Sequence, residues 1–147
     1  MSTDNSRYTL LHTRTQSFLA AFIAGETDKI LTDQLTTTPP PRVTEYGPSW
    51  ATSRLPFLGK TFVGREGWTE YFTAVDSTLE ILPSSTGSEA EVSVDEREGV
   101  ACVRGKAVFK AVKTGREWEE DFVMRVSGFD GEGRIGVVEV WGDTLSE

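Results

Sequence analysis

The sequence predicts an α+β domain in which helices cover one face of a cone-shaped, curved antiparallel sheet. In the first half of the chain, apolar residues recur at helical spacing over residues 5–24 and again from Arg65 onward. The second half carries long strand-like segments joined by glycine-containing turns. Helices followed by antiparallel strands are typical of α+β folds. A chain of 147 residues has the length of one domain, so we expect a single domain over residues 1–147.

The first predicted helix spans residues 5–24, because its apolar side chains share one face and Gly25 then provides a stop. A shorter helical segment follows at residues 26–35. Residues 36–41 contain three consecutive prolines and are predicted to be extended, since proline blocks a helix at its own position and before it. Residues 42–46 then have the composition of a strand.

Residues 47–64 form a predicted loop that contains Trp50 and several other large apolar side chains. Long ordered loops of this kind are uncommon unless they cover something. From Arg65 the spacing turns helical again, with Trp68, Tyr71 and Phe72 on one face. This helix is expected to pack against the sheet.

The sheet is predicted from segments that lie almost entirely in the second half. A strand begins at residues 79–82, residues 83–88 form a turn, and a strand follows at residues 90–95. The three long strands are predicted at residues 100–112, 117–128 and 134–142.

The first long strand is too long to run straight. At about 3.3 Å per residue it would extend roughly 43 Å, whereas a compact domain of this size has a radius of gyration of about 15 Å. The strand must bend, and Gly105 and Gly128 are plausible bending points. A strongly curved sheet with helices across its mouth forms a cone and leaves a cavity.

The turn at Thr114 and Gly115 predicts which side chains face that cavity. Placing Lys113 opposite Arg116 puts a mainly apolar set toward the helices. This inner set comprises Val103, Gly105, Ala107, Phe109, Ala111, Trp118, Glu120, Phe122, Met124 and Val126. The acidic run 117–121 is most simply a solvent-facing surface that pairs with lysines across the hairpin. Arg104 opposite Arg125 is unexplained in this register and indicates an acidic partner or a register error.

The turn at residues 130–133 leaves two registers open for the last strand. A four-residue loop turns Glu139 inward beside Met124, together with Val137 and Trp141. A three-residue loop instead turns Glu139 outward beside Arg125, as a surface salt bridge. We favour the inward register because it directs more apolar side chains toward the helices.

Composition excludes several function classes. A formal net charge of −8 at pH 7 argues against nucleic acid and anionic membranes as partners, because binding to them depends on Lys and Arg. One histidine, His12, and one cysteine, Cys102, cannot supply the usual nitrogen and sulfur ligands of zinc, so no metal is expected. The longest apolar stretch, residues 18–24, is far shorter than the ~20 residues that span a bilayer. The start of the chain has no secretion signal, so we expect a soluble, cytoplasmic protein.

Several segments resemble the SnoaL-like branch of the nuclear-transport-factor-two-like superfamily. They are the long first helix, residues 58–68, the helix through Tyr71 and Phe72, residues 129–135 and residues 139–143. The resemblance covers nearly the whole chain and is closest to fungal isomerases of secondary metabolism. It implies a cone with an internal pocket, often in a dimer, and cofactor-independent acid–base chemistry on a hydrophobic small molecule. A dehydratase or epoxide hydrolase of the same fold, and a non-catalytic binding or adaptor module, remain alternatives.

By position, Arg42, Trp118, Phe122 and Glu139 resemble places from which fungal isomerases of this group line their cavities. We expect Glu139 to shuttle a proton and Arg42 to stabilise an oxyanion or enolate, with a structural ion pair as the alternative. Tyr46 either donates to a substrate carbonyl or packs. The expected substrate-binding residues are Trp50, Phe109, Trp118, Phe122, Met124 and Trp141.

The outer face of the sheet is expected to carry an apolar strip between charges, made of Val108, Val123, Val138 and Val140. Such a strip suggests a twofold homodimer through the outer sheet face. A crossing segment of the same chain is the alternative.

Overall fold

The computed structural model describes residues 6–82 and 90–142 of the chain. Its helices are α1 (Ser6–Ala24), α2 (Thr27–Lys29), which continues into a π-helical turn (Ile30–Gln34), and α3 (Gly64–Thr78). Its strands are β1 (Arg42–Tyr46), β2 (Thr61–Val63), β3 (Leu79–Ile81), β4 (Glu91–Asp95), β5 (Val100–Ala111), β6 (Glu117–Ser127) and β7 (Val137–Gly142). None of the helices in this described part combines the length and the apolar character needed to cross a membrane.

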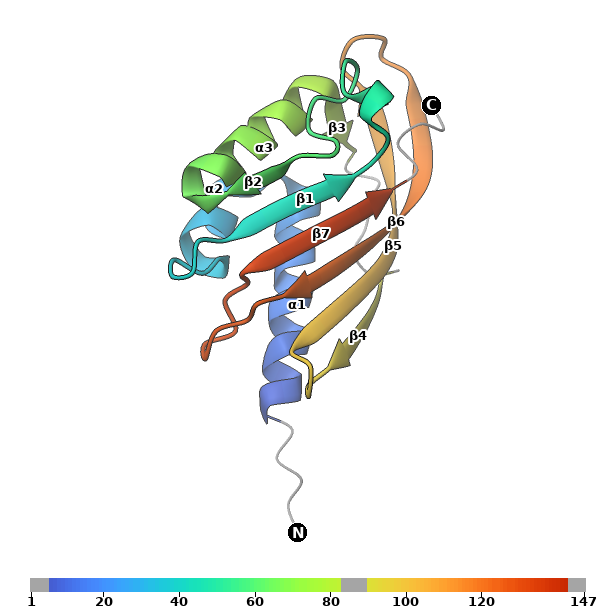
Figure 1. Cartoon of the computed structure of the whole chain (residues 1–147). Coiled ribbons are helices and arrows are strands. Elements are labelled where there is room, and N and C mark those ends of the chain that lie inside the picture. The colour runs from blue at the N-terminus through green and yellow to red at the C-terminus, as the bar shows by residue number, and fades with distance from the viewer. Residues whose placement is uncertain (1–5, 83–89, 143–147) are drawn as a thin grey trace.

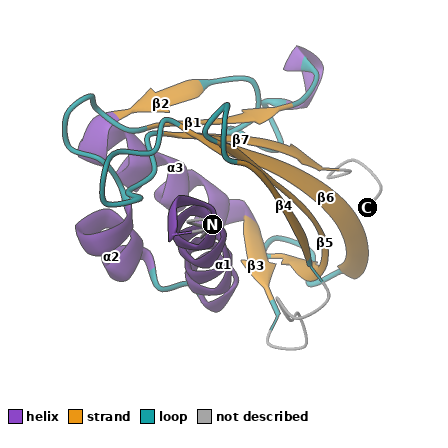
Figure 2. Cartoon of the chain, turned by 90° about the horizontal axis from the view of Figure 1, so that it is seen from below, coloured by secondary structure: helices purple, strands orange, loops and turns teal. Residues whose placement is uncertain are grey.

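The strands form one strongly curved sheet whose concave side holds the helices (Figure 1 and Figure 2). The strand order is β2-β1-β7-β6-β5-β3, and β4 also pairs with β5. The pairing of β1 with β7 is parallel, and the other strand pairs are antiparallel. The predicted α+β cone is therefore confirmed, with one parallel pair that the sequence did not indicate.

Most predicted elements are found within a few residues of their expected bounds. The clearest exceptions are β2, which lies in a segment predicted to be a loop, and β7, which begins at Val137 rather than at residue 134. Residue 135 leaves the hairpin because Ile135 forms a parallel bridge with Leu35. The turn predicted at residues 83–88 lies outside the described residues.

The hairpin of β5 and β6 has the predicted faces but a different register. Lys110 opposes Glu117, so the pairing is shifted by two residues from the expected one. The reason is a longer loop, which closes with a hydrogen bond of 2.8 Å from the amide of Ala111 to the carbonyl of Arg116. A shift of two residues keeps every side chain on its predicted face. It also places Arg104 opposite Val123, so the unexplained arginine pair was a register error.

The hairpin of β6 and β7 contradicts the favoured inward position of Glu139. Arg125 opposes Glu139, and Ser127 opposes Val137. The loop runs from Gly128, which has a φ of +67°, to Gly136, whose amide donates to the carbonyl of Ser127 at 3.1 Å. This register differs from the favoured one by a single residue, which reverses both faces of β7. Glu139 and Trp141 therefore face outward, whereas Val138 and Val140 are buried.

The core fills the space between the helices and the sheet, and the long loop contributes to it. Leu55, Phe57 and Leu58 of this loop are all buried, which explains why so many large apolar residues occur there. Phe18 of α1 and Trp68 of α3 are fully buried and meet edge to face. These contacts hold α1 and α3 against the concave side, where they bound a small cavity.

Candidate active site

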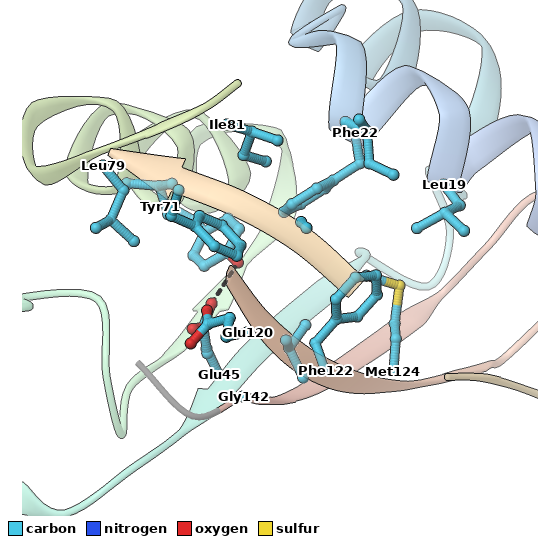
Figure 3. Close-up of a pocket in the computed structure, with 15 residues that line it drawn as sticks. Leu19, Phe22, Glu45, Tyr71, Leu79, Ile81, Glu120, Phe122, Met124 and Gly142 are labelled. Carbon is cyan, nitrogen blue, oxygen red and sulfur yellow. Dashed lines mark hydrogen bonds between the residues drawn. The ribbon is translucent and has the colours of Figure 1, made fainter. Parts of the chain in front are cut away.

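The cavity lies between α1, α3 and the inner face of the sheet (Figure 3). Its walls are mainly apolar and include Leu19 and Phe22 of α1 together with Phe109, Phe122 and Met124 of the sheet. The space open to the centre of a water-sized sphere is about 40 Å³, which is room for about three water molecules. The cavity is therefore small in this conformation.

Glu45 brings a carboxyl group into this apolar space. It follows Val43 by two positions in β1, so both side chains point to the inner face, while Arg42 and Tyr46 point outward. Glu45 is only 7% exposed. Its Oε1 accepts a hydrogen bond of 2.9 Å from the phenol of Tyr71 (Figure 3).

Tyr71 is held in place by its position on the apolar face of α3. Its side chain is fully buried, and its ring packs among Phe57, Phe62 and Trp68. This packing fixes the direction of its hydroxyl group, which is the condition for orienting a neighbouring carboxyl group.

Burial sets the proton affinity of this pair. Desolvation raises the pKa of Glu45 from 4.5 to about 7, even though the hydrogen bond from Tyr71 lowers it. At neutral pH, roughly half of such a group is ionised. Desolvation, and then the nearby carboxylate, raise the pKa of Tyr71 well above its usual value of 10, so Tyr71 remains a hydrogen-bond donor. Glu45 can thus both accept and return a proton near neutral pH.

Glu120 is a second carboxyl-bearing residue in the lining of the cavity. It is 5% exposed and lies on the inner face of β6 between Trp118 and Phe122. Its neighbours in sequence, Glu119 and Asp121, point to the outer face. The cavity therefore contains two carboxyl groups, and none of its lining residues in the described chain is basic.

The aromatic wall on the sheet side matches the prediction in part. Phe109, Phe122 and Met124 line the cavity. Trp118 is on the inner face as predicted and stacks on Phe109 at a ring distance of 6.0 Å, but it is not part of the lining. Gly105 makes room for this wall, because a Cβ there would lie 2.8 Å from Cζ of Phe122.

The three predicted catalytic residues all lie on the outer face of the sheet, where Tyr46 and Glu139 contact each other. The phenol of Tyr46 donates to Oε2 of Glu139 at 2.9 Å, and Oε1 of Glu139 accepts from Arg125 at 3.0 Å. The hydrogen bond to Glu139 is the main reason why the pKa of Tyr46 is raised, while the positive charge of Arg42 lowers it. The pocket position predicted for Glu139 is wrong, because β7 has the other register.

The remaining predicted contacts are also outside the cavity. Trp141 stacks on Tyr46 at a ring distance of 4.9 Å on the outer face. Trp50 is 71% exposed in a short 3₁₀ turn (Ser49–Ala51) and does not line the cavity. Within residues 6–82 and 90–142, no three His, Cys, Asp or Glu side chains lie close enough together to hold a metal ion.

Sequence reasoning missed the polar half of the site. The register of the hairpin predicts Glu120 on the inner face, whereas the acidic run 117–121 predicts a solvent-facing side chain for it. Glu45 alternates with Arg42 and Tyr46 along β1, and this alternation is the pattern that distinguishes it from them. Tyr71 was expected on the packed face of its helix, but nothing local indicates which carboxyl group it meets.

Comparison with known proteins identifies the fold. No family model and no curated protein matches the sequence. Among solved structures, an NTF2-like protein from Burkholderia xenovorans LB400 is 18% identical, with a TM-score of 0.68 over 94% of this chain and 92% of that one. The BvnE pinacolase from Penicillium brevicompactum is 14% identical, with a TM-score of 0.63 over 94% and 89% of the two chains. A protein named as a candidate SnoaL-like polyketide cyclase from Mesorhizobium loti is 14% identical, with a TM-score of 0.57 over 87% and 95%.

These similarities extend over nearly the full length of each chain, at identities at which only the fold is shared. The expected cone with helices on its concave side is common to all three comparisons. The chain therefore has the NTF2-like fold.

Proposed function

We propose that the protein is an isomerase or cyclase that acts on a hydrophobic small molecule without a cofactor. The observation that carries this proposal is the buried pair of Glu45 and Tyr71, in which an apolar cavity raises the pKa of Glu45 to about 7. A carboxyl group of this kind can remove a proton from carbon and return it elsewhere on the same molecule. Isomerisation and cyclisation both need such a transfer.

Each polar residue has a separate part in this scheme. The carboxylate of Glu45 takes a proton from a carbon next to a carbonyl group, and the resulting carboxylic acid returns it at the product position. Tyr71 keeps the carboxyl group oriented through Oε1. Glu120 supplies a second carboxyl group. In its protonated form this group donates a hydrogen bond to the substrate oxygen, on which negative charge develops during proton removal.

The resemblance to fungal isomerases supports a role in secondary metabolism. One of the similar structures is a pinacolase from a fungus, and another is named as a candidate polyketide cyclase. These names support the class of reaction that we propose for the cavity, but they do not identify the substrate.

A second candidate function is a binding or adaptor module without catalysis. The small size of the cavity favours it, because about 40 Å³ of open space accommodates no substrate larger than a few water molecules unless side chains move. In that case, the exposed aromatic residues of the outer face would be the functional surface.

We also propose that two copies of the chain associate through the outer face of the sheet. Tyr46, Val123 and Trp141 are each at least 41% exposed on this face. The strands β1, β5, β6 and β7 direct basic and acidic side chains outward in nearly equal numbers: Arg42, Arg104, Lys106, Lys110 and Arg125 against Glu117, Glu119, Asp121 and Glu139. In a chain of net charge −8, the nearly balanced charge of these four strands lets two copies approach there with little repulsion.

Deuterium exchange tests the catalytic proposal without knowledge of the substrate. Hydrophobic ketones and enones are incubated with the protein in heavy water, and exchange at carbons next to the carbonyl group is followed by NMR. The proposal predicts catalysed exchange for at least one ketone that depends on Glu45. Binding of these compounds without exchange would support the binding module instead.

A further inference from the structure

A second depression, which we call the outer groove, adjoins the cavity. It measures about 320 Å³ by the same criterion that gives about 40 Å³ for the cavity. The two spaces share a wall of five side chains, Phe22, Ile23, Val75, Leu79 and Ile81. Three of them, Phe22, Leu79 and Ile81, are labelled in Figure 3. The outer groove thus has the space that the cavity lacks and is separated from it only by the side chains of this wall.

The ends of two helices give the outer groove a negative character. Ala24 and Gly25, at the end of α1, and Asp76, in the last turn of α3, all belong to its lining. Neither helix has a basic residue in its last turn. The carboxyl-terminal end of a helix carries partial negative charge, which favours a cation nearby.

The carboxylate of Asp76 adds to this negative charge. The other titratable residue in the described lining, Glu80, alternates with Leu79 and Ile81 along β3 and opposes Lys110 on the outer face, so Asp76 supplies the charge of the groove. Partial desolvation raises the pKa of Asp76, which means that its carboxylate has lost some of the water that would stabilise its charge. A cation in the groove would restore part of that stabilisation.

Aromatic rings complete the chemistry of the outer groove. Phe22 and Phe72 both line it, with ring centroids 6.1 Å apart. An organic cation bound near an aromatic face is stabilised more than an inorganic ion that keeps its water shell. The groove therefore combines acceptors for an ammonium group with a surface for the carbon atoms attached to it.

We propose that the outer groove binds the ammonium group of a hydrophobic amine, and that this amine is the substrate whose apolar body passes the shared wall into the cavity. The inference rests on the proposed function, because it assigns a substrate class to the same site. In this assignment Asp76 determines substrate specificity, because it binds the ammonium group while Glu45 transfers the proton elsewhere on the substrate.

Calorimetric titration with three probes of the same apolar body tests this assignment. The probes are naphthylethylamine, naphthylethanol and naphthylpropionate, which carry a positive, a neutral and a negative group at neutral pH. We expect the amine to bind roughly three- to tenfold more tightly than the alcohol, and the carboxylate to bind least, which is the size of effect typical of a partly exposed charge pair and a helix end.

Two variants distinguish amine binding by the groove from a general attraction of cations to the negatively charged protein. Asp76→Asn should abolish the preference for the amine, whereas Glu70→Gln, the same loss of charge at an exposed position of α3, should retain it. Equal affinity for amine and alcohol, no measurable amine binding, or a preference that survives in Asp76→Asn would overturn the proposal. Since the readout is binding, an amine preference without deuterium exchange would reject the catalytic function alone, and exchange without an amine preference would reject the groove alone.

Discussion

The phenol of Tyr71 donates a 2.9 Å hydrogen bond to Oε1 of Glu45 inside the cone. Both side chains are almost completely buried, and their surroundings are apolar. A carboxyl group in water would be ionised at neutral pH, whereas here the pKa of Glu45 is about 7. The pair therefore provides proton transfer near neutral pH with a geometry fixed by the packing of α3.

Removal of the hydroxyl group in Tyr71→Phe should raise the pKa of Glu45 further, because the hydrogen bond from Tyr71 is the contribution that lowers it. The acidic limb of the pH–activity profile should move to higher pH, since a smaller fraction of Glu45 is then ionised at a given pH. Loss of this buried donor should also cost about 1–3 kcal/mol of unfolding free energy.

Tyr46→Phe is the matched control for that change, because Tyr46 makes the equivalent hydrogen bond to Glu139 on the outer face. It should leave the pH profile of activity unchanged. An identical shift in both variants would show that the profile does not report on Glu45.

The stability of the fold should depend on pH through Glu45. Its pKa is raised from 4.5 in the unfolded chain to about 7 in the fold, so the folded state holds the proton more tightly. The stability that this proton gives is complete below pH 4.5 and is lost as pH rises to about 7, and it amounts to about 3 kcal/mol. Urea denaturation of the wild type and of Glu45→Gln across this range should show Glu45→Gln gaining about that much relative to the wild type. A constant difference between the two would mean that Glu45 titrates normally.

Glu139→Gln should have a much smaller effect on stability. The ion pair between Glu139 and Arg125 lies at the surface, with side-chain exposures of 21% and 44%. Surface pairs of this kind contribute less than about 1 kcal/mol. Denaturation at neutral pH measures the change, and a loss above about 2 kcal/mol would indicate that Glu139 is buried in the assembled protein.

Substitution of Trp141 tests the proposed homodimer. Trp141 stacks on Tyr46 in an exposed aromatic pair. Trp141→Glu replaces one ring of this pair by a negative charge and should dissociate a dimer at micromolar concentration. Sedimentation should show a dimer for the wild type and for Tyr8→Glu, a comparable change at an exposed residue of α1. A wild-type monomer would contradict the proposal.

The fold was more predictable from the sequence than the site, and the two hairpins show why. In β5 and β6 an error of two residues changed no face, so the apolar wall of Phe109, Phe122 and Met124 was found correctly. In β7 a register error of one residue predicted Glu139 at the inner face, where the structure has Val140. The difference came from the loop between Gly128 and Gly136, whose shape depends on the bridge from Ile135 to Leu35, a contact between distant parts of the chain.

The partner of Glu45 could not be predicted for a related reason. Glu45 and Tyr71 are 26 positions apart, and they meet only because β1 lies inside the sheet beside β7 while α3 crosses its concave side. Periodicity identifies the face of an element, but it does not show which elements face one another. The strand β2 is only three residues long and is recognised by its pairing with β1. Its composition alone does not indicate a strand, so it was not predicted.

The most direct test of the central claim compares Glu45→Gln with Glu139→Gln in the same deuterium-exchange assay. Both changes replace a carboxyl group by an amide of equal size, one in the cavity and one on the outer face. We expect Glu45→Gln to lower the exchange rate by about a hundred- to ten-thousand-fold, while Glu139→Gln stays within about twofold of the wild type. A Glu45→Gln variant that retains full activity, or a loss of activity in Glu139→Gln alone, would contradict the assignment of Glu45 as the base.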